Sequence, residues 1–197
     1  MAKRIAPDHC CGVIIDVQQF FLAQMDKRVR SNIVTNTKNL VRLLSHFRIP
    51  IVVTLERPVD KKGALPREIG KHLSRLSETF EKDFFDLCKE KKIKGYLGRL
   101  KKRKVIVAGC ETDVCVLQSC LGLLSLGYEV YAVEELLFSS SRNVESAIAR
   151  MKAEGAIFLT YKSLYHELIE SVEGGRHTEK SLETFNLPGD LPDSAVQ

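Results

Sequence analysis

The chain has 197 residues, of which 44% are hydrophobic and 28% are charged. These fractions are typical of a single globular domain and, with a net charge of only +5, exclude a wholly disordered chain. The apolar runs are strand-sized, well short of the ~20 residues that a membrane-spanning helix needs. The first residues also lack the pattern of a signal peptide, so the sequence predicts a cytoplasmic protein with no membrane partner.

Short apolar runs alternate along the chain with longer segments of helical period. The runs predict six strands, at residues 12–16, 50–55, 79–81, 104–109, 129–133 and 156–160. The other segments predict helices at residues 29–47, 66–76, 84–100, 113–126, 142–154 and 163–172. Continuous apolar strands separated by amphipathic helices favour a parallel sheet that is covered on both faces. The sequence therefore predicts an α/β domain over residues 1–172, with three layers (α/β/α) and a six-stranded, mostly parallel sheet in the order 3-2-1-4-5-6.

The six cysteines lie in a chain that is large enough to fold without disulfides and that we expect in a reducing compartment. Free thiols are therefore expected. Because no Cys-x-x-Cys pair occurs and the five histidines are scattered, the sequence does not predict a cysteine-bound metal.

Positive charge is concentrated in residues 89–104, which hold nine basic residues and one acid, a local balance of +8. One interpretation is an amphipathic helix whose lysines lie on the solvated face. The other is a surface that binds nucleic acid or another anionic partner. The first is favoured because the segment shows neither a regular alternation of aromatic and basic side chains nor a known nucleic-acid motif. The second remains as an alternative function for the chain.

Two strand ends carry residues that could do chemistry. The first strand closes with Asp16, and the fourth closes with Gly109, which a segment from Cys110 to Cys115 joins to a helix. Open parallel sheets bind ligands beyond the carboxyl ends of their strands, where the strand order reverses. Because strands one and four are neighbours in the predicted order, Asp16 and Cys115 should face the same crevice.

Cys115 lies in the first turn of the predicted helix, where backbone N–H groups and the helix dipole favour a thiolate and can hold an oxyanion. Asp16 is a candidate general base for this thiol. The structural alternative is a buried cysteine and an aspartate that caps a turn. Position alone does not separate the two interpretations.

These residues resemble the isochorismatase-like cysteine hydrolases, a family that includes nicotinamidases. The resemblance extends from about Val13 to Leu168 and rests on three motifs in the family's order. They are residues 16–21 (DVQQFF), Lys82 with Phe85, and residues 109–116 (GCETDVCV), of which the last is the most specific. A weaker match covers residues 134–142 (EELLFSSSR).

The resemblance implies a catalytic triad, with Asp16 as the base, Lys82 as the cation and Cys115 as the nucleophile. Without it, Lys82 would be interpreted as a surface lysine. It further implies a cis peptide between Cys110 and Glu111, which turns the backbone N–H of Glu111 toward that of Cys115 to form an oxyanion hole. The expected reaction is hydrolysis of a C–N bond in a small amide-like metabolite, through a thioester and without a cofactor.

Departures from the family pattern argue against one of its subclasses, the nicotinamidases. Nicotinamidases carry an Asp-x-His metal motif just after strand two, where this chain has Leu55-Glu56-Arg57-Pro58. The sequence therefore predicts no bound metal and disfavours nicotinamide as the substrate. Glu56 and Arg57 are candidates for the rim of the pocket, and Gln18 and Phe21 of the first motif are further candidates for binding substrate.

The resemblance also suggests a homo-oligomer. The segment at residues 173–197 is too short and too rich in proline to form a domain. It is interpreted either as a frayed terminus or as a tail that contacts another subunit. The apolar side chains of Phe185, Leu187 and Leu191 favour the second interpretation.

Overall fold

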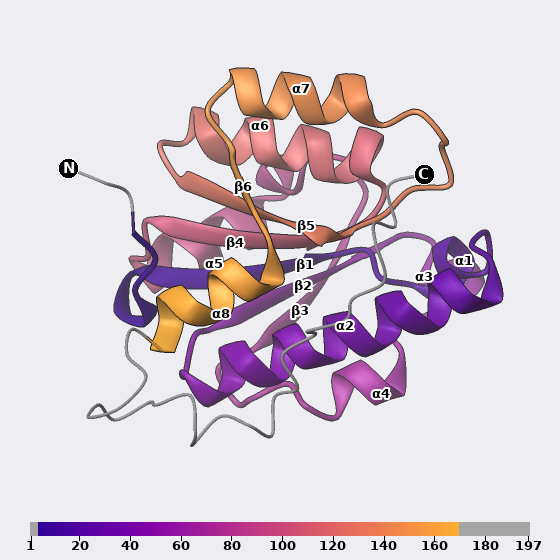
Figure 1. The fold of residues 1–197 in the computed structure, drawn as a ribbon, viewed down its shortest axis with the longest axis horizontal. Coiled ribbons are helices and arrows are strands. Elements are labelled where there is room, and N and C mark those ends of the chain that lie inside the picture. The colour runs from indigo at the N-terminus through magenta and orange to yellow at the C-terminus, as the bar shows by residue number, and fades with distance from the viewer. Residues whose placement is uncertain (1–3, 170–197) are drawn as a thin grey trace.

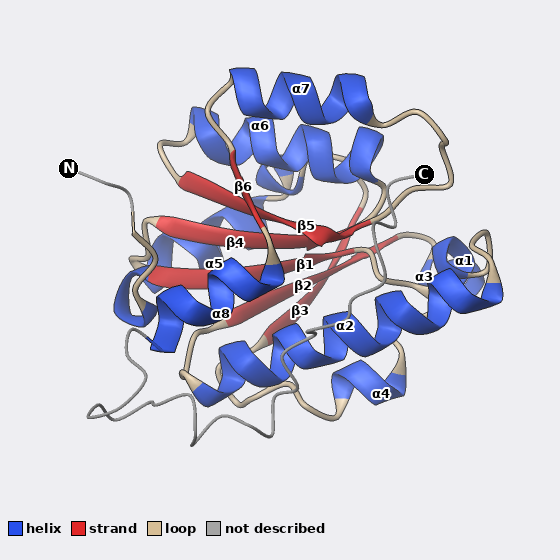
Figure 2. Cartoon of the chain, viewed as in Figure 1, coloured by secondary structure: helices blue, strands red, loops and turns tan. Residues whose placement is uncertain are grey.

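The computed structural model describes residues 4–169, and all six strands in that range belong to one sheet (Figures 1 and 2). Their order is β3-β2-β1-β4-β5-β6, and every neighbouring pair is parallel. The strands are β1 (Cys10–Ile15), β2 (Ile51–Glu56), β3 (Glu78–Lys82), β4 (Lys104–Gly109), β5 (Glu129–Leu137) and β6 (Ile157–Leu159). The predicted α/β class and strand order are confirmed.

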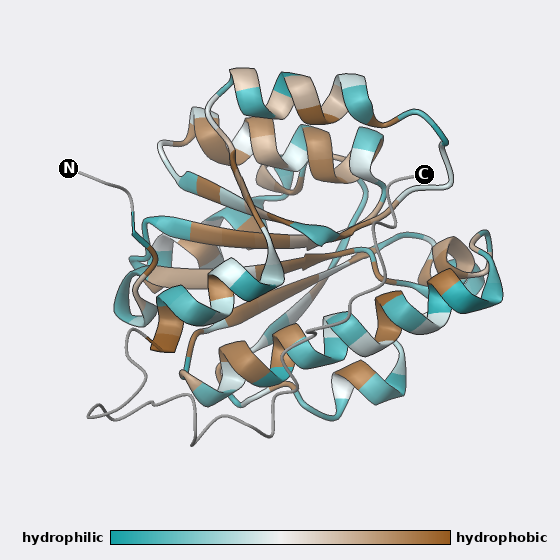
Figure 3. Cartoon of the chain, viewed as in Figure 1, coloured by the Kyte–Doolittle hydropathy of each residue, from teal (hydrophilic) through white to brown (hydrophobic). Residues whose placement is uncertain are grey.

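Helices cover both faces of this sheet, as predicted (Figure 1). One face carries α2 (Lys27–His46), α4 (Arg67–Gly70) and α8 (Tyr161–Ile169), and the other carries α5 (Lys91–Leu100), α6 (Leu117–Ser125) and α7 (Glu145–Ala153). Alternate residues of β1 point into the two cores: Ile14 packs on the side of α2, and Val13 and Ile15 pack on the side of α5 and α6. The central strands β1, β2 and β4 are accordingly mostly apolar, whereas the edge strand β3 is polar and the helices are apolar on one side only (Figure 3).

Several helices differ from their predicted bounds. Residues 66–76 form only the single turn of α4, which ends at Gly70, a weak helix former. Residues 84–100 form a 3₁₀ turn (Leu87–Lys89) followed by α5. Here the carboxylates of Asp86 and Glu90 accept hydrogen bonds from backbone N–H groups, which replaces helical bonding before α5 begins.

Two single-turn helices, α1 (Gln19–Leu22) and α3 (Val59–Lys62), follow the carboxyl ends of β1 and β2. They were not predicted because four residues are too few to display a helical period. Both lie at the end of the sheet where the predicted catalytic residues gather (Figure 1).

Gly109, the last residue of β4, allows β4 to approach β1 closely at this end. Its φ is +130°, and a Cβ there would lie 2.0 Å from the carbonyl oxygen of Ile15. The next residue, Cys110, donates its backbone N–H to the same oxygen at 2.9 Å. The segment that leads to Cys115 therefore begins directly beside Asp16, and the peptide between Cys110 and Glu111 is cis, as the resemblance implies.

Two other sequence expectations have a structural outcome, and a third lies beyond the part of the chain that the structure describes. All six cysteines are free thiols, as expected. Among residues 4–169, no helix is long and apolar enough to cross a membrane. The tail at residues 173–197, with the last residues of the predicted 163–172 helix, lies outside the described residues.

Candidate active site

The structure brings Asp16, Lys82 and Cys115 together in the interior of the molecule. The Lys82 Nζ lies 2.7 Å from Asp16 Oδ2 and donates to Cys115 Sγ at 3.4 Å. The exposed fraction of the side chain is 0% for Asp16 and Lys82, and Cys115 is 2% exposed. The Lys82 ammonium and the Asp16 carboxylate form a buried ion pair beside the thiol. An ammonium without such a partner would not be stable in the interior.

Asp16 directly follows β1 and has a φ of 49°, in the left-handed region that aspartate tolerates better than most residues. Its Oδ1 accepts the Thr54 hydroxyl at 2.8 Å, and its Oδ2 forms an ion pair with the Lys82 ammonium. Burial raises the pKa of Asp16 above its ordinary value, although Lys82 and the Thr54 hydrogen bond oppose this.

Lys82 is the last residue of the edge strand β3, which pairs only with β2 in the sheet. The other residues of β3 are exposed or half-buried, so the burial of Lys82 is specific to the end of the strand. Burial alone would lower the pKa of Lys82, but the negative charge of Asp16 is the main effect that outweighs it and raises that pKa. The ammonium therefore stays protonated.

A fourth side chain, Glu56, completes the cluster. Cys115 Sγ donates to Glu56 Oε2 at 3.0 Å, and Lys82 Nζ lies 3.6 Å from the same oxygen. The other oxygen, Oε1, pairs with Lys62 of α3. Burial would raise the pKa of Glu56, but its hydrogen bonds with Lys62 and Cys115 lower that pKa overall.

The sequence analysis placed Glu56 only at the rim of the pocket. Glu56 ends β2, the strand next to β1, so the argument that joined Asp16 to Cys115 applies to it as well. A charged residue that closes a mostly apolar strand next to β1 was the signal that could have found it.

Cys115 lies in a π-helical turn (Thr112–Val116) that precedes α6. Contrary to the sequence expectation of an easily ionised thiol, burial and the charge of Asp16 raise its pKa, against the opposing effect of Lys82. At neutral pH the resting side chain is therefore a thiol, which needs a proton acceptor before it can act as a nucleophile.

The remaining predicted residues lie around this cluster. The amide of buried Gln18 accepts from Glu56 N at 2.7 Å and donates to the carbonyl oxygens of Glu56 and Gly63 at 3.1 and 2.7 Å. Phe21 is buried, with the Lys62 ammonium 5.8 Å from its ring centroid. Arg57 is half-exposed and pairs with Glu81 and Asp83. Roles for these residues in substrate binding stay predictions.

Glu111, whose backbone N–H is one of the two predicted oxyanion donors, opens the turn that carries Cys115. Its carbonyl oxygen accepts from the N–H groups of Val114 and Val116, and its carboxylate accepts from Ser140 N at 3.2 Å. The glutamate side chain thus holds the loop after β5. The oxyanion hole itself stays a prediction.

One group of metal-ligating atoms occurs among the described residues. The ligand atoms of Asp16, Glu56 and Cys115 lie within 4.8 Å of one another. The Lys82 ammonium contacts all three side chains, so a cation there would face an existing positive charge. The arrangement is therefore better suited to an internal ion pair than to a metal ion.

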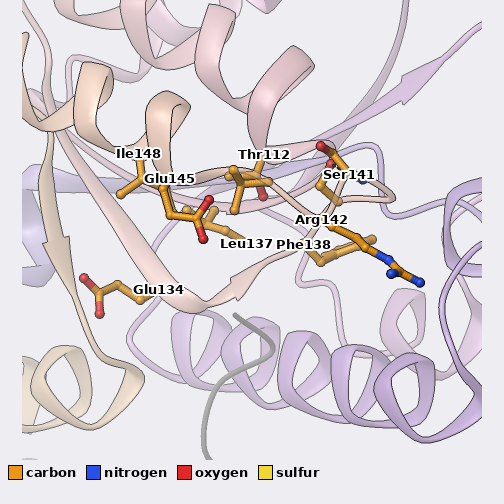
Figure 4. Close-up of a pocket in the computed structure, with 10 residues that line it drawn as sticks. Thr112, Glu134, Leu137, Phe138, Ser141, Arg142, Glu145 and Ile148 are labelled. Atoms are coloured by element: carbon orange, nitrogen blue, oxygen red, sulfur yellow. Dashed lines mark hydrogen bonds between the residues drawn. The ribbon is translucent and has the colours of Figure 1, made fainter. Parts of the chain in front are cut away.

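A pocket is lined in part by Thr112, the first residue of the turn that holds Cys115 (Figure 4). Leu137, Phe138 and Ile148 supply apolar lining, and Glu134 and Arg142 extend to opposite sides. Thr112 joins the pocket to the turn by donating its N–H to the carbonyl oxygen of Phe138 at 3.1 Å. The Ser-Ser-Arg segment of the weaker sequence match thus packs beside the nucleophile turn.

Comparisons with known proteins agree with this fold. Residues 10–163 match the isochorismatase domain family. Isochorismatase family protein 1B of Dictyostelium discoideum is 28% identical over 173 residues, which are 84% of this chain and 81% of that protein.

Two solved structures resemble the fold. The MAR1 ribonuclease structure from Caenorhabditis elegans is 26% identical, has a TM-score of 0.86 and is matched over 99% of this chain and 97% of that one. The YcaC gene product of Escherichia coli, described as an octameric hydrolase of unknown specificity, is 19% identical with a TM-score of 0.84, over 94% of this chain and 90% of that one.

Proposed function

Because the chain belongs to the isochorismatase family, we propose that it is a cysteine hydrolase that cleaves a C–N bond in a small amide-like metabolite. The observation that carries this proposal is the buried contact of the Cys115 thiol with the Lys82 ammonium, beside Asp16. Such a contact stabilises the thiolate that attacks a carbonyl carbon. Membership of the family is consistent with hydrolase activity. The amide-like substrate is our proposal.

The proposed reaction has two stages. Cys115 Sγ attacks the carbonyl carbon, the amine leaves and a thioester remains, which water then hydrolyses. Following the resemblance, Asp16 takes the thiol proton as the general base and delivers it to the amine as the C–N bond breaks. Lys82 is the cation of the triad, and the backbone N–H groups of Glu111 and Cys115 hold the oxyanion.

Replacing Cys115 with alanine tests this proposal. We expect Cys115→Ala to abolish turnover and to leave the fold intact by circular dichroism, because the thiol is the group that bonds to the substrate. A panel of small amides, hydantoin-derived carbamoyl compounds and ureido acids is the assay from which a substrate would be chosen. A variant that hydrolyses that substrate at the parental rate would exclude the thioester mechanism.

A non-catalytic, anion-binding role is the second candidate, and a groove beside α5 favours it. Lys89, Lys91 and Lys92 line the groove together with Phe80 and Phe84. These lysines make no ion pair within residues 4–169, and the aromatic rings beside them are the feature that the sequence analysis did not find. The Caenorhabditis elegans neighbour is named a ribonuclease, so single-stranded RNA is the anionic partner to test.

Binding of a fluorescent oligouridylate, followed by anisotropy, separates the two candidates. If this surface binds RNA, Lys91→Glu with Lys92→Glu should abolish binding, whereas Cys115→Ala should retain it. Unchanged binding in the double variant, or no binding by the parent protein at low salt, would reject the second candidate.

We also propose that the protein assembles as a homo-oligomer. Two large apolar side chains that follow β3, Phe84 and Phe85, are 51% and 48% exposed, and Phe20, which follows β1, is 49% exposed. Contact between copies would cover such side chains. The octamer of the Escherichia coli neighbour is in keeping with this proposal.

A further inference from the structure

Glu56 is the member of the buried cluster nearest to solvent. It is 9% exposed, whereas Cys115 is 2% exposed and Asp16 and Lys82 are 0% exposed. Its carboxylate oxygen Oε2 accepts the hydrogen bond of the Cys115 thiol at 3.0 Å. A substrate that reaches the sulfur from solvent therefore passes against this carboxylate.

Contacts on its backbone and on its other carboxylate oxygen fix the position of Glu56. The Gln18 side chain accepts from the backbone N–H of Glu56 at 2.7 Å and donates to its carbonyl oxygen at 3.1 Å, which holds the end of β2. Lys62 of α3 pairs with Oε1. Oε2 is therefore held facing the sulfur, and a group that approaches the sulfur meets a carboxylate already in place.

The proposed reaction leaves Oε2 without a hydrogen-bond donor. Among the described residues, the Cys115 thiol is the one donor to this oxygen, and Asp16 takes the proton of that thiol as the general base. The Lys82 ammonium lies 3.6 Å from Oε2, beyond hydrogen-bond range, and is shared with Asp16 and the sulfur. A mostly buried carboxylate oxygen that loses its donor is unfavourable, so a donor on the substrate would be stabilised there.

The scissile nitrogen of an amide can supply that donor. It is bonded to the carbon that the sulfur attacks, so it lies beside the sulfur and within reach of Oε2. With the carbonyl oxygen on the predicted backbone donors, Glu111 and Cys115, an N–H of this nitrogen can donate to Oε2. An ester oxygen in the same place has only lone pairs, which a carboxylate repels.

We propose that Glu56 determines the class of substrate by accepting a hydrogen bond from the N–H of the scissile nitrogen. The substrate class is then primary and N-monosubstituted amides, including ureido compounds, and esters and N,N-disubstituted amides are disfavoured. Because the hydrogen bond is to a charged group, we expect a discrimination of about 10- to 100-fold. The inference rests on the proposed cysteine hydrolase function, and Asp16 remains its general base.

Two alkylating reagents of the same shape test the proposal without a known substrate. N-methyl-2-iodoacetamide and methyl iodoacetate are both uncharged, and they differ in having an N–H or an oxygen beside the carbonyl. With either reagent the C–S bond forms as the C–I bond breaks, and the thiol proton passes to Asp16. The quantity measured is the amide-to-ester ratio of rates at Cys115, divided by the same ratio for glutathione. We expect this normalised ratio to be about ten or more in the parent protein.

Replacing Glu56 should remove the preference. In Glu56→Met, which has no acceptor oxygen, the normalised ratio should fall to about one. Glu56→Gln keeps the shape of the side chain and should also lower the ratio, because its oxygen is uncharged and its amide can donate to the ester. An unchanged ratio in either folded variant would overturn the proposal.

The ratio separates the hydrogen bond from electrostatics. Loss of the Glu56 charge alters the reactivity of the thiol toward both reagents alike, so that effect cancels. Glu68→Met makes the same substitution at an exposed residue of α4 and should keep the parental ratio. A fall in Glu68→Met as large as that in Glu56→Met would count against the assignment to Glu56. Peptide mapping by mass spectrometry assigns the label to Cys115 among the six cysteines.

Failure of the proposed function and failure of this inference give different results. Labelling of Cys115 by both reagents no faster than that of the other five thiols would reject the activated nucleophile, and with it the proposed function. Fast labelling of Cys115 with a parental ratio of about one would reject only the role of Glu56.

Discussion

Burying the Lys82 ammonium carries a large electrostatic cost, which its ion pair offsets. Its ammonium is fully buried and pairs with a fully buried carboxylate, Asp16. Removing one partner of such a pair leaves an uncompensated charge in the interior, which typically costs about 3–5 kcal/mol. Lys82→Met should therefore strongly lower the free energy of unfolding.

Urea denaturation of a double-mutant cycle checks this expectation. Asp16→Asn combined with Lys82→Met removes both charges and should be more stable than Lys82→Met alone. If the double variant instead loses the sum of the two single effects, Lys82 and Asp16 are not coupled in the native protein.

Glu56 has a pH signature of its own in stability. Its pKa is lowered from the ordinary 4.5, so the native state favours the ionised carboxylate more than the unfolded chain does. That contribution is fully present above the unfolded pKa and is lost as the pH falls through the folded pKa. The difference in unfolding free energy between the parent and Glu56→Gln should therefore shrink below about pH 4.5, as measured by urea titration at several pH values. A difference that is constant down to pH 3, well below that value, would contradict it.

Single residues also show which parts of the candidate site could be predicted from the sequence. Asp16 and Cys115 could be placed together because each follows a strand that meets the reversal of the sheet order. Lys82 could not be placed from local pattern, since Glu81-Lys82-Asp83 has the composition of an exposed segment and only the family motif set it apart. Glu56 was recognised but not connected to the thiol, because the contact depends on side-chain directions that a one-dimensional pattern does not contain.

At the level of elements, the contact between β1 and β4 depends on one missing side chain. A Cβ on Gly109 would lie 2.0 Å from a backbone oxygen of β1, which cannot move without breaking the sheet, and its φ of +130° is unsuited to other residues. Gly109→Ala should lose at least about 3 kcal/mol, from backbone strain and overpacking together.

Gly98 in α5 is the matched control, since no heavy atom lies within 4 Å of the Cβ it would carry. Gly98→Ala should stabilise the protein by about 0.5–1 kcal/mol, because alanine loses less backbone entropy in a helix. Thermal unfolding of both variants measures the contrast, and similar stability of the two would refute the steric argument.

Elements were predicted best where apolar periodicity was long. The central strands and α2 follow from it closely, whereas α4, the 3₁₀ turn before α5 and the π turn at Cys115 depart from the predicted helices. In the turn before α5, for example, the carboxylate of Asp86 accepts a hydrogen bond from the backbone N–H of Cys88, and the average pattern of a segment does not record such a contact.

For the whole molecule, the exposed aromatic side chains lead to a prediction about assembly. Light scattering on the full chain at micromolar concentration should give the mass of an oligomer, and Phe84→Asp with Phe85→Asp should shift it toward the monomer if these side chains are covered between copies. A monomeric parent protein would exclude the homo-oligomer. The same measurement on a chain that ends at Glu173 tests the predicted role of the tail.

The charges around Cys115 have a consequence for how substrates arrive. Two carboxylates, Asp16 and Glu56, are matched by two ammonium groups, Lys62 and Lys82, so the cluster carries no net charge. A balanced cluster projects little field into the solvent, and diffusing metabolites are not steered toward it. Capture of a small amide should therefore depend little on ionic strength even when the substrate is charged, although the protein as a whole is basic.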